Sequence, residues 1–184
     1  PEISETNEIY GEYNFSNKLK FTSTAYRAKI SDRIESNSAY SKHENKLISL
    51  NQEGLESELL FSGDNQKIGL FTNISKSKKT DGSAQSRRPS FSFGGNYSKK
   101  FQSSNYGLFD LSLIYKHTGK YMDYDGSATT KQKSTDLVDF LIKKDWFGSV
   151  ISLNMTNLLN ERYEKPATYS QDGRQLRIGI FKKY

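Results

Sequence analysis

The stretch Phe109-Asp110-Leu111-Ser112-Leu113-Ile114-Tyr115-Lys116 decides the fold class of this chain. Its odd positions are apolar or aromatic, and its even positions are mostly polar. Successive side chains of a β-strand point to opposite faces, so this period of two predicts a strand with one apolar face and one polar face.

The same period recurs along the rest of the sequence. It predicts about nine strands, near residues 4–15, 18–30, 46–61, 66–78, 89–101, 106–118, 133–143, 148–158 and 174–184. The alternating apolar sets include Ile68, Leu70, Thr72 and Ile74; Phe91, Phe93 and Tyr97; Val138, Phe140 and Ile142; Ile151, Leu153 and Met155; and Leu176, Ile178 and Ile180. The expected fold is all-β and antiparallel.

The predicted connections alternate in length. Short turns at 15–17, 62–64, 102–104 and 145–147 alternate with longer polar segments at 31–45, 79–88, 119–132 and 159–173. Short turns at one rim and long loops at the other are typical of a bacterial outer-membrane β-barrel. We therefore expect Val138, Phe140, Ile142, Leu111 and Leu113 to face lipid, and Asp139, Ser112 and Asp110 to face the lumen.

Composition agrees with membrane-spanning strands. The mean hydropathy is −0.79 and 34% of the residues are hydrophobic, yet 13% are aromatic. Alternating strands average their lipid-facing and lumen-facing residues, so a transmembrane barrel has the hydropathy of a soluble protein. Aromatic residues near strand ends are expected to form interfacial girdles: Tyr10, Tyr13, Phe101, Tyr115, Trp146, Phe147 and Tyr184. An aromatic-rich soluble β core is the alternative.

Strand count predicts that more of the barrel precedes residue 1. Bacterial single-chain barrels have an even number of strands, whereas nine are expected here. An open sheet in lipid would leave its edge backbone groups without partners, at a cost of several kcal/mol each. We expect this chain to be a fragment of a larger barrel.

Several function classes are disfavoured. The net charge is +6, but no recognition helix or zinc-ligand spacing is present, so nucleic acid is not an expected partner. Cysteine is absent, which removes thiolate metal sites and cysteine nucleophiles. We find no nucleophile beside a base, no phosphate loop and no acid pair. The chain is not expected to be an enzyme, and no catalytic, metal-ligating or cofactor-binding residue is assigned.

Three groups of polar residues are candidate binding features, each with a plainer alternative. Asp123 to Ser127 is similar to part of a calcium loop but also to an ordinary turn. His43 and His117 are possible haem ligands or exposed loop residues. Lys76 to Lys79 and Arg87-Arg88 are placed where they either pair with outer-leaflet phosphates or are simply solvated.

Three motifs carry a family resemblance. Asn157-Leu158-Leu159-Asn160-Glu161-Arg162-Tyr163-Glu164, followed by Gly173-Arg174 and an alternating strand, resembles the end of TonB-dependent receptors. Pro1 to Ile9 and Glu53 to Glu56 resemble two earlier motifs of that family, in the same order. The structural motif residues are Asn157, Leu158, Tyr163, Gly173 and Arg174.

The resemblance implies a 22-stranded barrel with an N-terminal plug. Residues 1–184 are then the C-terminal part of the barrel domain, about strands 14 to 22, without the plug, the TonB box and the first strands. Leu176, Ile178, Ile180 and Tyr184 resemble the terminal signal that engages the barrel assembly machinery.

The implied location is the outer membrane of a Gram-negative bacterium. The implied partners are outer-membrane lipid and lipopolysaccharide, the TonB complex through the plug, and a small chelate. Tyr163-Glu164, Tyr169 and Gly173-Arg174 most resemble the vitamin B12 (cobalamin) receptors, although ferric siderophore and haem receptors share these elements. The alternatives are a passive channel or adhesin-like barrel, and a soluble β protein that binds polyanions.

Overall fold

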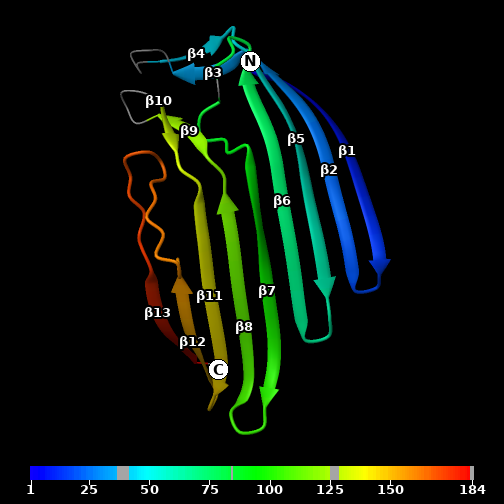
Figure 1. Cartoon of the computed structure of the whole chain (residues 1–184), viewed down its shortest axis with the longest axis vertical. Helices are drawn as coiled ribbons and strands as arrows, with labels where there is room; N and C mark the ends of the chain where they lie inside the picture. Colours follow the sequence, from blue (N-terminus) through cyan, green and yellow to red (C-terminus); the bar gives the residue numbers. More distant parts are fainter. Residues whose placement is uncertain (37–41, 84, 125–128, 183–184) are drawn as a thin grey trace.

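The fold is a single curved antiparallel sheet with two short hairpins at one end (Figure 1). The computed structural model describes residues 1–36, 42–83, 85–124 and 129–182. Strands account for 73% of these described residues, and no helix occurs among them. Consistently, no helix in the described part is long and apolar enough to cross a membrane.

Nine strands form the main sheet, in the order of the chain. They are β1 (Ile3–Ser16), β2 (Leu19–Ser31), β5 (Leu50–Ser62), β6 (Gln66–Lys79), β7 (Phe91–Ser103), β8 (Gly107–Thr118), β11 (Thr135–Trp146), β12 (Ser149–Thr156) and β13 (Gln175–Lys182). Each predicted strand corresponds to one of these, with ends that differ by a few residues. The expected all-β antiparallel architecture is therefore confirmed.

The two ends of the sheet differ as the sequence predicted. In Figure 1 the tight turns β1–β2, β5–β6, β7–β8 and β11–β12 lie at the lower ends of their strands, and the long connections lie at the opposite, upper ends. Both β1 and β13 run from the loop end to the turn end. Two loops carry hairpins that the sequence did not indicate: β3 (Arg33–Ser36) with β4 (His43–Lys46), and β9 (Tyr121–Tyr124) with β10 (Thr129–Gln132).

The register divides the side chains into two contrasting faces. One row crosses eight strands through Leu19, Phe61, Ile68, Tyr97, Leu113, Phe140, Met155 and Leu176, and every member is apolar or aromatic. The neighbouring row on the other face runs through Ser62, Lys67, Ser98, Ser112, Leu141, Asn154 and Arg177. Leu141 is its one apolar member.

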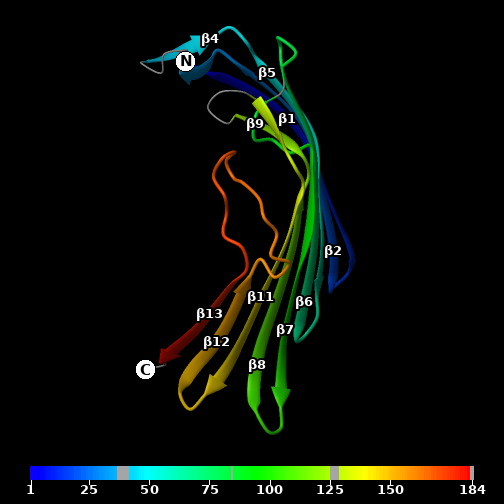
Figure 2. The same ribbon diagram turned by 60° about the vertical axis from the view of Figure 1, so that its left-hand side comes forward.

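The polar face is the concave one. The connection from β12 to β13 folds back over this face, as Figure 2 shows from the side. Lys116, Thr118 and Ser92 lie on it and line a cavity with that connection. The predicted lumen-facing residues Asp139, Ser112 and Asp110 share this face, and the predicted lipid-facing residues share the convex one.

The sheet has no conventional hydrophobic core. Among the described residues, the buried apolar side chains are Ala28, Leu50 and Ala167. The large convex-face side chains are instead exposed; Leu70 is 51% exposed and Ile178 is 72% exposed. A soluble domain rarely leaves so large an apolar surface uncovered, whereas a membrane barrel presents it to lipid.

Of the seven aromatic residues predicted to form girdles, five lie on the convex face or at a tight turn. Tyr13, Phe101 and Tyr115 lie on the convex face, and Trp146 and Phe147 lie at a tight turn. Tyr10, in contrast, pairs with Thr24 on the concave face, where its hydroxyl donates to Glu12 Oε2 at 2.7 Å. The prediction was wrong for Tyr10 because it used position along the strand without parity. Tyr184 lies outside the described residues.

Candidate functional site

The connection between β12 and β13 is fixed at its base by Asn157. The Asn157 side-chain amide donates to the carbonyls of Glu161 and Asp172, at 2.9 and 3.2 Å, and its carbonyl oxygen accepts from the Glu161 amide at 2.8 Å. Asn157 is 6% exposed and has a φ of +51°, a left-handed conformation that asparagine adopts more readily than most residues. This residue therefore joins both ends of the connection.

Asp139 holds the backbone of that anchor. Its Oδ1 atom accepts a hydrogen bond from the backbone amide of Asn157 at 2.8 Å. Asp139 lies on the concave face with the other residues that were predicted to face the lumen, and it has a structural role that the alternation pattern did not indicate.

The other motif residues complete the base of the loop. The Leu158 amide donates to Val138, the Arg174 amide donates to Asn160 Oδ1, and the Tyr163 carbonyl accepts from Gln171. Gly173 lies against Asn160, where a Cβ atom would be 2.6 Å from Asn160 Oδ1. The structure thus gathers all five predicted motif residues at one loop base.

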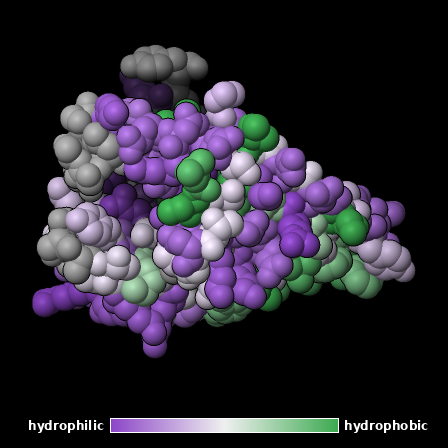
Figure 3. Space-filling model, turned by 90° about the horizontal axis from the view of Figure 1, so that it is seen from above, coloured by the Kyte–Doolittle hydropathy of each residue, from purple (hydrophilic) through white to green (hydrophobic). Residues whose placement is uncertain are grey.

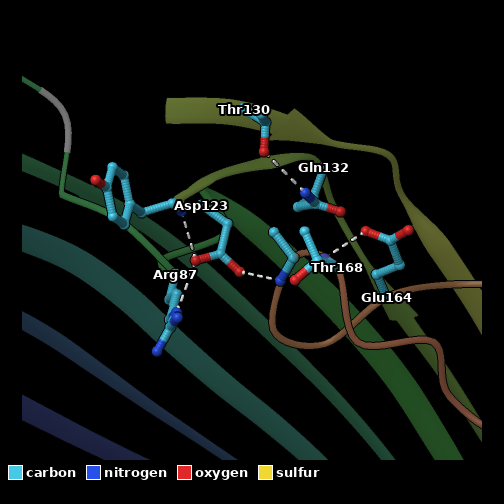
Figure 4. Close-up of polar contacts among 8 residues, drawn as sticks. Arg87, Asp123, Thr130, Gln132, Glu164 and Thr168 are labelled. Carbon is cyan, nitrogen blue, oxygen red and sulfur yellow. Dashed lines mark hydrogen bonds and ion pairs between the residues drawn. The ribbon is translucent and has the colours of Figure 1, made fainter. Parts of the chain in front are cut away.

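Asp123 connects three segments that are distant in the sequence. Its carboxylate accepts from Arg87 Nε at 2.7 Å, from the Tyr124 amide at 2.8 Å and from the Ala167 amide at 2.8 Å. Figure 4 shows these contacts between the β6–β7 loop, the β9–β10 hairpin and the β12–β13 connection. Asp123 is fully buried, and we call this three-way junction the loop latch.

Electrostatics keep the latch carboxylate ionised. Burial raises the pKa of Asp123, but the hydrogen bonds from Arg87, Ala167 and Tyr124 outweigh burial and leave the pKa below its usual value. Burial and the nearby Asp123 charge raise the pKa of Tyr121 in the same hairpin. The latch therefore contains a buried anion with a guanidinium partner.

The calcium interpretation of this hairpin is not supported. Asp123 is already occupied by three donors, and the described residues contain no group of three possible metal-ligating side chains. Asp125, Gly126 and Ser127 lie outside the described residues.

The two histidines do not converge on a ligand site. His43 lies on the outer hairpin strand β4, whereas His117 lies on the convex face, where its Nδ1 atom is 2.9 Å from Asp136 Oδ1 and its ring stacks on Phe93. On the convex face of β8, the last apolar or aromatic residue toward the loop end is Tyr115. It lies two rows nearer the turn end than Ile74, the last apolar residue on β6. The apolar band on the convex face therefore runs obliquely, as expected when strands are tilted, and His117 lies at its outer edge.

A large cavity lies between the concave face and the loops. Its volume is about 1470 Å³. Ser92, Lys116 and Leu137 form its sheet wall, the β9–β10 hairpin covers one side, and the segment from Asn160 to Gly173 covers another. Seen from the loop end in Figure 3, the surface is mostly hydrophilic, and hydrophobic side chains gather along one margin.

The cavity is strongly basic. Two acidic residues line it, Asp123 and Glu164, and Arg87 already neutralises Asp123. Six cationic residues line it: Arg87, Lys116, Lys131, Lys133, Arg162 and Lys165. Tyr121 and Tyr163 add aromatic surface. This combination suits a large anionic ligand with some apolar area. The sequence alone did not indicate this cluster, because its members come from four separate segments of the chain.

Comparison with known proteins supports the fold. No protein-family model matches the sequence, and no curated protein matches it. The ferripyoverdine receptor of the outer membrane of Pseudomonas aeruginosa is 18% identical, with a TM-score of 0.79 over 99% of this chain and 27% of its own. The ferric yersiniabactin uptake receptor from Yersinia pestis is 16% identical, with a TM-score of 0.79 over 97% and 28%.

A third solved structure agrees with these two. The ferric-catecholate import receptor from Escherichia coli is 15% identical, with a TM-score of 0.78 over 100% of this chain and 28% of its own. This chain therefore has the same fold as part of the β-barrel in these solved structures. It spans just over a quarter of their length. All three neighbours are transport receptors, and none of the three is a cobalamin receptor.

Proposed function

We propose that this chain is the C-terminal part of the barrel of a TonB-dependent receptor in the outer membrane of a Gram-negative bacterium, and that the receptor imports a ferric chelate. The basic cavity is the observation that carries the choice of ligand. Fold supports the receptor class, because the three neighbours described above are outer-membrane or import receptors.

Charge favours a ferric siderophore over cobalamin. Six cations and two carboxylates line the cavity, and Glu161, 3.6 Å from Lys133 Nζ, adds a third carboxylate beside it. The cations remain in excess. Ferric complexes of catecholate or carboxylate chelators carry negative charge, whereas a neutral corrinoid would gain little from such a lining. The segment from Asn160 to Arg174 resembles cobalamin receptors in its motif residues. These residues, however, form the hydrogen-bonded base of the loop and do not by themselves define a ligand.

In this proposal the chain's residues capture the ligand and do not catalyse a reaction. Arg162, Lys131 and Lys133 come from two different loops and face one cavity. Anionic oxygens of the chelate would accept from them, while the loop latch holds the two loops in position. Energy for release would come from the TonB complex acting on the plug, and insertion would depend on the barrel assembly machinery.

Ligand binding by the complete receptor tests this proposal. The purified receptor in detergent is titrated with a panel of an anionic ferric catecholate, a neutral ferric hydroxamate, haem and cyanocobalamin, and intrinsic fluorescence reports binding. The anionic ferric chelate should bind most tightly. The triple change K131Q/K133Q/R162Q should weaken it by about tenfold or more, because each charge-assisted hydrogen bond contributes about 1.5–3 kcal/mol.

Lys67 provides the matched control. It is exposed on the same concave face, but at the turn end of β6. K67Q should leave affinity unchanged within about twofold. Tight binding of cyanocobalamin with no binding of any ferric chelate would contradict the proposal.

A further inference from the structure

The convex face of β1, β2, β5 and β6 changes from apolar to charged within one row. The last apolar row toward the loop end contains Ile9, Ala25, Leu55, Ile74 and Phe91. From Ile68 to Ile74 the apolar band covers roughly 20 Å along β6, at about 3.3 Å per residue. A lipid-facing band of this kind is about 25 Å tall, so its outer edge falls at this row.

Two polar rows follow directly outside the band. The first contains Asn7, Arg27, Glu53 and Lys76, and the second contains Glu5, Lys29, Asn51 and Lys78. We call these eight residues the outer belt. All eight are exposed. Four are cations and two are carboxylates, so the outer belt carries a net positive charge.

The cations of the outer belt are mostly without acidic partners. Lys76 Nζ lies 3.6 Å from Glu53, with both side chains more than half exposed. In the part of the chain that the structure describes, no carboxylate oxygen lies within 4.0 Å of Arg27, Lys29 or Lys78. These three cations are therefore free to bind external anions.

Acidic residues on the same four strands prefer the opposite face. Glu8, Glu12, Glu56 and Glu58 lie on the concave face. Within the segment Lys76 to Lys79, Lys76 and Lys78 belong to the convex face and Lys79 belongs to the concave one. The convex face of these four strands therefore has more cations than carboxylates.

We propose that the outer belt binds the phosphate groups of a phosphorylated glycolipid in the outer leaflet of the membrane, with Arg27, Lys29 and Lys78 as the principal phosphate ligands. The inference rests on the proposed membrane location. At the level just outside the apolar band, lipid headgroups replace acyl chains, and guanidinium and ammonium groups pair with phosphate through charge-assisted hydrogen bonds.

Lipid retention by the complete receptor tests this inference. Wild-type receptor and R27Q/K29Q/K78Q are purified in detergent, incubated with bisphosphorylated lipid A, and the bound lipid is counted by native mass spectrometry. A basic residue near an anionic membrane contributes roughly a fivefold change in binding. The triple variant should therefore lose at least about tenfold in lipid A occupancy at limiting lipid.

K67Q/K99Q/K100Q is the matched control. It removes the same charge from the turn ends of β6 and β7. Its lipid A occupancy should stay within about twofold of wild type. Lipid A stripped of phosphate should bind the wild type no better than it binds the triple variant, and inorganic phosphate alone should not be retained.

Either retention of lipid A by a folded triple variant or an equal loss in the control overturns the inference. If the triple variant does not give a folded, heat-modifiable band, the single changes K29Q and K78Q replace it and should each reduce occupancy about fivefold. Ferric-chelate affinity is measured on the same samples. It should be unchanged, so loss of lipid binding is distinguished from loss of the receptor's function.

Discussion

The two faces of this sheet use the same backbone for opposite purposes. On the convex face, a row of eight side chains across the sheet is entirely apolar or aromatic, whereas the neighbouring concave row has Leu141 as its one apolar member among seven. Many of the large convex side chains are exposed, whereas the concave Asp139 carboxylate accepts a hydrogen bond that holds the base of a loop. Adjacent residues of one strand therefore belong to different environments, and a substitution should have an effect set by its parity.

The largest expected effect comes from a charge on the convex face. Phe140→Arg should destabilise the folded receptor by about 2–4 kcal/mol, because the guanidinium would face hydrocarbon near the bilayer midplane. Leu141→Arg, one residue away on the concave face, should cost much less. Urea titration of the receptor in bilayers, with the folded fraction read from heat-modifiable mobility, measures both. Equal losses would show that the two faces are equivalent.

Asp139 is a poorer control than Leu141, even though it shares the concave face. Its carboxylate accepts from the Asn157 amide, so replacing it releases the loop anchor as well as changing the lumen. Asp139→Arg should consequently be destabilising, in contrast to the mild effect that the alternation pattern alone predicts.

Loss of the loop anchor should rank second. Asn157→Ala removes three hydrogen bonds of a nearly buried amide and leaves alanine in a left-handed conformation. We expect a cost of about 1–3 kcal/mol. Hydrogen exchange should show faster exchange across residues 157–174. Asn154→Ala, on the same strand, should not change exchange in that segment; if it does, the effect belongs to β12 as a whole.

The strands were predictable from sequence because their alternation is local. Phe109 to Lys116 already contains the parity of β8, and turn lengths gave the orientation of the sheet. The β3–β4 and β9–β10 hairpins were missed because segments such as His43–Lys46 are short and polar and show no apolar alternation. The loop latch was also missed, because Asp123 lies 36 residues from Arg87 and 44 from Ala167. No spacing rule relates such positions.

The latch should respond to acid. Since the native pKa of Asp123 is lowered, the folded state favours the ionised carboxylate. Its stabilising contribution should be complete above the ordinary aspartate pKa of about 3.9 and be lost as the pH falls through the lower native pKa. The Ala167 amide, corrected for intrinsic exchange, should thus be equally protected from pH 7 down to about pH 5 and lose protection below pH 4. In Asp123→Asn this pH dependence should disappear.

The smallest expected effect concerns the ion pair of Lys76 and Glu53. Both side chains are more than half exposed and the two atoms are 3.6 Å apart. Glu53→Gln should change stability by less than about 1 kcal/mol. The same urea titration measures it, and a loss as large as that of Phe140→Arg would mean that the outer belt is buried in the complete receptor.

Accessibility along β11 tests the central claim most directly. Spin labels are placed singly at positions 138 to 143 of the complete receptor in bilayers, and their collisions with a lipid-soluble and a water-soluble quencher are compared. The lipid-soluble quencher should favour Val138, Phe140 and Ile142, and the water-soluble one should favour Asp139, Leu141 and Lys143. Equal accessibility to both quenchers at Phe140 and Leu141 would contradict a membrane barrel.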